Sequence, residues 1–70
     1  MHLKELIESL KKRRGVLGIT QDQLAELSGV GLRTLKALES GKGNPTFETV
    51  TKLAEILGME LKLEVKVPIL

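Results

Sequence analysis

Apolar residues recur at helical spacing over the first part of the chain. A stripe with basic residues on its other face is formed by Leu3, Leu6, Ile7, Leu10 and Leu17. Spacing of three or four residues lines one side of an α-helix, and Gly18 is a typical residue to end such a helix. The pattern predicts a first helix that begins near residue 3 and ends at Gly18.

Two short helices with a tight turn between them come next. Thr20, followed three residues later by Gln23, forms a capping box and predicts a helix over about 21–28. The apolar positions of this helix are Leu24, Ala25 and Leu27. The turn is Gly29-Val30-Gly31, and we expect Val30 to fill the core between the two helices.

The second of these helices is predicted over about 32–40, before Gly41. Leu35 and Leu38 are spaced to face inward, whereas Arg33 and Lys36 lie three residues apart and share the outer face. Two helices joined by a tight turn, with basic residues outward on the second, have the layout of a helix-turn-helix. That arrangement places one helix in the major groove of DNA.

A fourth helix and a strand complete the predicted elements. Thr46 is an N-cap for a helix over about 47–57, whose inward positions are Val50, Leu53, Ala54 and Leu57. After Gly58 the period changes to two, with charged residues between Met59, Leu61, Leu63, Val65 and Val67. Strict alternation predicts a β-strand. We therefore expect an all-α four-helix domain over 1–58, one C-terminal strand over 59–67, and a tail over 68–70.

A single strand with an open edge is not stable alone, so we expect it to pair with its copy across a two-fold axis. An antiparallel pair centred on Leu63 sets Glu60 against Lys66 and Lys62 against Glu64. On the other face it sets Met59 against Val67 and Leu61 against Val65. A register shifted by one residue brings like charges together. The pattern predicts a homodimer; the alternative is that the strand lies against its own helices.

Composition excludes several kinds of site. The 70 residues contain no cysteine, one histidine and one aromatic residue, Phe47. Disulfides, thiolate metal sites and histidine zinc sites are therefore not expected, and no cofactor is predicted. His2 has no nucleophilic partner nearby, and the carboxylates of Asp22 and Glu26 read as a solvated helix face. We expect no metal site and no enzyme.

Charge is distributed unevenly along the chain. Residues 1–18 contain five Lys or Arg and two Glu, and the basic excess gathers over 11–14, whereas the net charge of the whole chain is +2. The sequence contains no apolar run long enough for a membrane span and no signal-peptide pattern. We expect a cytoplasmic protein that lies on the nucleoid and has no membrane partner.

The run TQDQLAELSGVGLRTLKALESGKGNPT resembles the Cro/repressor-type (XRE family) helix-turn-helix of phage and bacterial regulators. The resemblance covers residues 3–58. A strand over 59–67 in place of the family's usual fifth helix, and GVGLR in the turn, are similar to HipB-type antitoxins, whose dimers pair a strand from each subunit.

The resemblance implies a role for each matching residue. Gln21 stands where the family clamps a phosphate and braces the recognition helix. The positions that face base edges are Leu32, Arg33, Lys36 and Ala37. Lys42 and Asn44 match the loop that grips the DNA backbone, and Arg14 and Glu39 match a buried ion pair between the first and third helices.

The chemistry of these side chains leaves alternatives open. The planar fork of Arg33 suits guanine O6 and N7, although it can instead contact a phosphate. Leu32 can touch a thymine methyl group or pack against the turn. Lys36 favours phosphate over guanine, and Ala37 permits close approach.

Three further residues lie near the expected interface. Gln21 and the helix amides beside it suit a phosphate, the alternative being plain capping. Thr34 can contact a phosphate or its own helix backbone. Arg13 is expected to add a charge on the DNA side.

These residues predict a sequence-specific repressor that binds double-stranded DNA as a homodimer on a pseudo-palindromic operator. The HipB resemblance adds a refinement, an antitoxin that also binds a HipA-like kinase toxin. The rival is a protein-interaction module that kept the fold without specific DNA binding, because Gly31 replaces the usual Ser or Thr cap and Leu32 replaces a common polar base reader.

Overall fold

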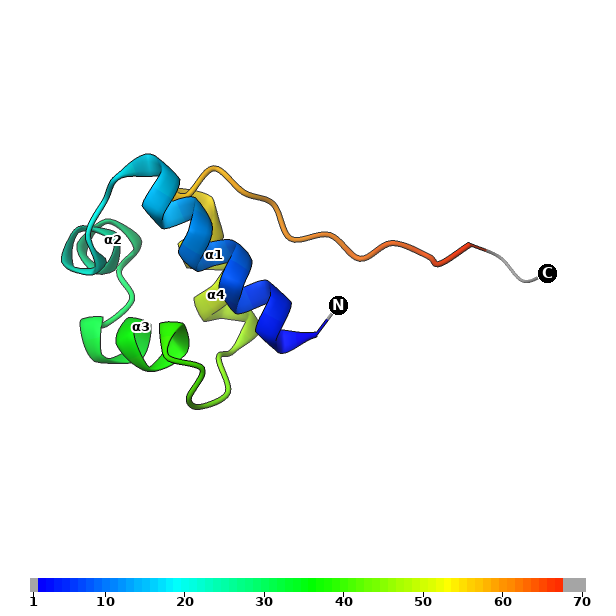
Figure 1. Cartoon of the computed structure of the whole chain (residues 1–70), viewed down its shortest axis with the longest axis horizontal. Coiled ribbons are helices and arrows are strands. Elements are labelled where there is room, and N and C mark those ends of the chain that lie inside the picture. Colours follow the sequence, from blue (N-terminus) through cyan, green and yellow to red (C-terminus); the bar gives the residue numbers. More distant parts are fainter. Residues whose placement is uncertain (1, 68–70) are drawn as a thin grey trace.

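Four helices form the folded part of the chain (Figure 1). The computed structural model describes residues 2–67, so the predicted tail over 68–70 lies outside the described residues. The helices are α1 (Leu3–Leu17), α2 (Gln21–Ser28), α3 (Leu32–Glu39) and α4 (Phe47–Ile56). The four predicted helices are confirmed, with α3 and α4 each ending one residue earlier than expected. None of the helices within 2–67 has the length and apolar content to cross a lipid bilayer.

All four helices contribute to one core. The most deeply buried large side chains belong to α2, α3, α4 and the residue after α4, and they are Leu24, Leu35, Leu53 and Leu57. From α1 the core receives Ile7 and Leu10. Val30 is buried in the α2–α3 turn, as predicted. Because α2 packs against both α3 and α4, the helix-turn-helix is fixed to the rest of the domain.

Three predicted apolar positions are not buried. Leu3 and Leu17, at the two ends of the α1 stripe, are 47% and 43% exposed, and Leu27 is 61% exposed. Leu3 and Leu17 are the first and last residues of α1. Leu27 lies roughly a third of a turn from the face that α2 buries through Leu24 and Ala25, because the helix turns about 100° per residue.

The helix ends follow from local sequence. At α2 the Thr20 hydroxyl accepts from the Gln23 amide at 3.0 Å, and the Gln23 side chain accepts from the Thr20 amide at 2.8 Å. At α4 the Thr46 hydroxyl accepts from the Thr49 amide. Gly58, with a φ of +69°, ends α4 in a Schellman motif, since the amide of Met59 donates to the carbonyl of Ala54. The N-caps and stop signals predicted from sequence therefore set the boundaries.

Residues 59–67 contain no strand in the described chain, contrary to the expectation for this segment. The segment starts against the helices, where Met59 packs on the core. It then runs away from the domain in an extended path (Figure 1). A strand exists only when its amides and carbonyls pair with a neighbour, and no other extended segment lies beside it within 2–67. The alternating pattern therefore produces an extended segment in the single chain, not a sheet.

Candidate DNA interface

The outer face of α3 is set by what the inner face buries. Leu35, Leu38 and Glu39 are buried, and the opposite side of a helix of 3.6 residues per turn is centred on Arg33 and Ala37. Lys36 and Thr34 lie on either side of that centre. Arg33, Thr34 and Lys36 are exposed, and Ala37 is half-buried. The surface of α3 thus presents a small residue between longer polar and cationic ones.

A shallow hollow of about 280 Å³ joins this face to the loop after α3. Five residues predicted to contact DNA line it, namely Arg33, Thr34, Ala37, Lys42 and Asn44. The rest of the lining is Leu38, Gly43 and Pro45. Residues eleven positions apart are therefore brought onto one surface. The loop reaches this position because α3 also ends in a Schellman motif, in which the Lys42 amide donates to the Ala37 carbonyl at 2.9 Å.

The cations of this surface are not neutralised by the protein. Within residues 2–67 the ion pairs are Arg14–Glu39 and Lys52–Glu48, so Arg33, Lys36 and Lys42 have no acidic partner there. Exposed cations without protein partners attract polyanions and release counterions when they bind them.

The N-terminus of α2 offers further donors. The hydroxyl of Thr20 accepts from the Gln23 amide, and its carbonyl accepts from the Leu24 amide. The first two amides of the helix, those of Gln21 and Asp22, have no partner in the described chain. Such amides and the helix dipole favour an anion. The side chain of Gln21 is half-buried, and its Nε2 donates to Glu39 Oε1 at 3.1 Å.

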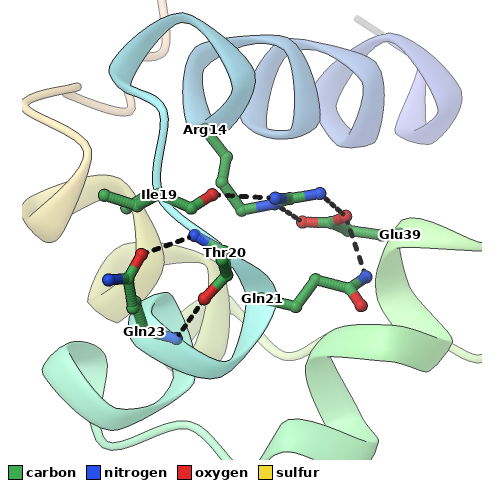
Figure 2. Close-up of polar contacts among 6 residues, drawn as sticks. All are labelled: Arg14, Ile19, Thr20, Gln21, Gln23 and Glu39. Carbon is green, nitrogen blue, oxygen red and sulfur yellow. Dashed lines mark hydrogen bonds and ion pairs between the residues drawn. The ribbon is translucent and has the colours of Figure 1, made fainter.

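An ion pair connects α3 to the rest of the domain (Figure 2). Arg14 Nε donates to Glu39 Oε2 at 2.7 Å, and Arg14 Nη2 donates to Oε1 at 2.8 Å. Arg14 Nη1 also donates to the carbonyl of Ile19 at 2.9 Å. The Glu39 side chain is 5% exposed and that of Arg14 is 20% exposed. Together with Gln21 this arrangement ties α3 to α1, to the α1–α2 linker and to α2.

The ion pair shifts both ionisation equilibria toward the charged forms. Burial alone would raise the pKa of Glu39. Hydrogen bonds from Arg14 and Gln21, with the positive charges of Arg14 and Lys11, outweigh burial and lower the pKa below its ordinary value. The hydrogen bond to Glu39 raises the pKa of Arg14 despite partial burial. The carboxylate and the guanidinium are therefore both charged near neutral pH.

Four of the nine predicted contacts do not line this hollow. Lys36 lies on the outer face of α3 and Gln21 is held by Glu39, whereas Arg13 and Leu32 contact other parts of the domain. Arg13 Nε donates to the carbonyl of Leu57 at 2.9 Å, so its side chain holds the C-terminal end of α4 and is not directed to the hollow. Leu32 is half-buried and packs against the core. This position is closer to the alternative in which Leu32 packs within the protein than to a contact with a thymine methyl group. Neither side chain lines the hollow on α3.

Sequence reasoning missed the role of Arg14 in holding the Ile19 carbonyl and that of Arg13 at Leu57. A signal was available, because Arg13 and Arg14 both fall on the side of α1 that carries Ile7 and Leu10. Lys12 falls on the opposite, solvent-facing side and is exposed. The basic run over 11–14 is thus divided between solvent and interhelical contacts.

Residues 10–63 match the helix-turn-helix family. The chain belongs to this XRE-type family. The match includes all of α2, α3 and α4 and the loop with Lys42 and Asn44.

Several curated relatives are named as transcriptional regulators. An uncharacterised HTH-type transcriptional regulator of Haemophilus influenzae is 44% identical over 61 residues, which cover 87% of this chain and 58% of the relative. The cryptic phage CTXphi transcriptional repressor RstR of Vibrio cholerae is 37% identical, with coverage of 77% and 48%. An uncharacterised HTH-type regulator of Methanothermobacter thermautotrophicus is 39% identical, with coverage of 73% and 74%. The chain thus spans only about half the length of the first two relatives.

Proposed function

We propose that this chain is a sequence-specific repressor that binds double-stranded DNA through the outer face of α3. The hollow shared by α3 and the following loop is the observation that carries the proposal. Arg33 and Lys42 reach it from two segments, and neither has an acidic partner within 2–67. A single cationic surface formed by a helix and the loop after it matches a major groove and the adjoining phosphates.

Each group on this surface has a distinct role. Arg33, at the centre of the outer face, reads guanine, and the half-buried Ala37 beside it lets the helix approach the base edges. Lys36, Lys42, Asn44 and Thr34 bind phosphates. Gln21 is held by Glu39, and the free amides at the start of α2 donate to a phosphate on the other side of the groove.

The active form is a homodimer on a pseudo-palindromic operator. Residues 59–67 of two copies pair about Leu63, which supplies each extended segment with the neighbour it lacks. Two recognition helices then read half-sites roughly 34 Å apart, or a multiple of that distance. Doubling the phosphate contacts also allows a domain of net charge +2 to bind tightly. We place this activity in the cytoplasm, on the nucleoid.

A paired double variant tests the proposal. A DNA ligand is first selected from a random duplex pool with the wild-type protein. Arg33→Ala with Lys36→Ala is then expected to raise the Kd for that duplex more than 100-fold at constant salt, without loss of helicity. The matched control, Lys12→Ala with Lys52→Ala, removes the same charge from solvent-facing positions on α1 and α4 and should change the Kd less than threefold.

Equal affinity of the two double variants would contradict the proposal. An unchanged Kd for the Arg33 and Lys36 variant would favour the rival, a protein-interaction module. The relative RstR is named a transcriptional repressor, which supports repression over activation.

The antitoxin role is a second candidate, and the extended segment over 59–67 favours it, because such a segment in place of a fifth helix is what the resemblance to HipB-type antitoxins implies. Purification of the chain with the product of its neighbouring gene tests this candidate. Recovery of a HipA-like kinase in a stable complex is expected if it is correct, and recovery of the regulator alone would refute it.

A further inference from the structure

A second hollow lies on the side of the domain from which the C-terminal segment leaves. It measures about 660 Å³ and is mostly apolar. Leu3 and Leu6 of α1, Phe47 of α4, and Leu61 and Leu63 of the extended segment form most of its wall. Phe47 is 73% exposed although it is the single aromatic residue of the chain. A large exposed apolar surface of this kind marks an interaction site.

The extended segment is only half anchored to this surface. Met59 packs on the core, and Leu61 is 37% exposed and lies among Leu6, Phe47 and Ala54. The following residues on the same face, Leu63, Val65 and Val67, are almost fully exposed. One apolar stripe therefore begins on the domain and continues beyond it with nothing to cover it in the single chain.

We infer that the hollow receives the end of the extended segment from a second copy of this chain, an inference that rests on the proposed homodimer. In an antiparallel pair, residues directly opposite each other point to the same face and have Cβ atoms roughly 5 Å apart. With Leu63 on the axis, Val65 of the second copy lies beside Leu61, and Val67 lies beside Met59. Both valines then face the surface on which Leu61 already packs.

The charges favour a second copy over an unrelated apolar partner. In an antiparallel pairing of the segment with itself, all four outward residues, Glu60, Lys62, Glu64 and Lys66, face a residue of opposite charge only when the centre is Leu63. A two-fold ribbon turns all its apolar residues to one side. Each helical domain thus lies beneath its own residues 59–61 and beneath residues 65–67 of the other subunit.

This interface leaves the DNA surface free. In Figure 1, α3 and the loop after it lie at the lower edge of the domain, whereas residues 59–67 leave from the upper right. The hollow lined by Phe47 and that lined by Arg33 share no residue. The dimer can form and bind an operator at the same time.

Dimer dissociation constants from sedimentation equilibrium test the inference. Leu63→Lys is expected to give a monomer, because it places two charges together at the axis. Phe47→Ala is expected to raise the dimer Kd at least tenfold, since a buried aromatic side chain is lost from both copies. The matched control, Leu27→Ala, removes another exposed large apolar residue and should change the Kd less than twofold. Circular dichroism checks that each variant keeps its helices.

The two failures can be distinguished. If Leu63→Lys gives a monomer while Phe47→Ala dimerises like the wild type, the strand pairing stands and the covered hollow is refuted. If the wild type is monomeric, or Leu63→Lys is still dimeric, the proposed strand dimer fails and the inference fails with it.

Cross-linking gives an independent reading, because the chain has no cysteine. Phe47→Cys mixed with Val65→Cys should form a covalent heterodimer with a short thiol cross-linker, whereas Leu27→Cys mixed with Val65→Cys should not. Equal yields from the two mixtures would overturn the placement.

Discussion

Replacing Arg14 by methionine should destabilise the protein strongly at neutral pH and less at acidic pH. The substitution removes both hydrogen bonds that Arg14 donates to Glu39 and the one it donates to Ile19. Glu39, whose side chain is 5% exposed, would keep the Gln21 amide at 3.1 Å as its remaining hydrogen-bond donor. The Glu39 carboxylate would then be buried without the Arg14 charge and hydrogen bonds that offset most of the cost of its burial.

The size of the effect follows from the burial of the pair. Breaking a fully buried ion pair costs about 3–5 kcal/mol, and the 20% exposure of Arg14 places this one near the lower end, about 3 kcal/mol. For a domain of this size each kcal/mol lowers the Tm by about 4–8 °C. Arg14→Met should therefore melt about 12–24 °C lower than the wild type at pH 7. Glu39→Gln should cost less, about 1–2 kcal/mol, because the stranded Arg14 can still reach water and the Ile19 carbonyl.

The contribution of Glu39 to the free energy of unfolding changes with pH in opposite directions in the wild type and in Arg14→Met. In the wild type the pKa of Glu39 is lowered below the value of about 4.3 for an unfolded chain. This stabilisation is present above pH 4.3 and is lost as the pH falls through the folded-state pKa. In Arg14→Met, burial is no longer outweighed by Arg14 and raises the pKa of Glu39. The folded variant then binds the extra proton, so its stability increases as the pH falls from 7 toward 4.

Thermal unfolding at pH 7 and pH 4, at one protein concentration, measures both effects. The difference in Tm between wild type and Arg14→Met should shrink at pH 4, and carboxylates common to both proteins cancel in that difference. Lys52→Met is the matched control. It breaks the exposed Lys52–Glu48 pair and should cost less than about 0.5 kcal/mol at either pH. A Tm difference for Arg14→Met that is the same at both pH values, or no larger than that of Lys52→Met, would refute the reasoning.

Two further predictions concern the helix ends and the DNA surface. Gly15→Ala should stabilise the protein by about 0.5–1 kcal/mol, because an added Cβ meets nothing within 4 Å in the exposed last turn of α1. Gly58→Ala should destabilise it, because Gly58 has a φ of +69°. Changes in Tm of the same sign for both variants would contradict this. Lys36→Ala should weaken binding to all duplexes alike and reduce the slope of log K against log salt by about one per subunit. Arg33→Lys should instead relax preference at one base pair of each half-site by about 1–3 kcal/mol, and uniform weakening across sequences would assign Arg33 to a phosphate.

Local sequence signals predicted most of the fold. Thr20, Gln23 and Thr46 fixed where helices begin, because each side chain caps amides within its own first turn. Glycines fixed where they end. The apolar positions alone did not show that Leu27 is exposed, because it lies off the face that α2 presents to its neighbours and burial depends on where neighbouring helices pack.

Nonlocal contacts were harder to predict. The Arg14–Glu39 pair is present in the structure. It was implied only by family resemblance, because 25 residues separate its members and no local pattern links them. Arg13 was predicted to add a charge on the DNA side, yet its Nε donates to a backbone carbonyl 44 positions away. The extended segment over 59–67 was predicted as a strand because its residues alternate between apolar and charged. Alternation specifies which residues share a face, but it does not supply the second strand with which the segment would pair.

Amide chemical shifts during titration with the selected duplex test the central claim most directly. At low ionic strength, the largest changes are expected at the start of α2, along Arg33–Ala37 and at Lys42 and Asn44, with small changes over 59–67. Changes confined to the Phe47 hollow, or none at any duplex concentration, would show that α3 does not bind DNA.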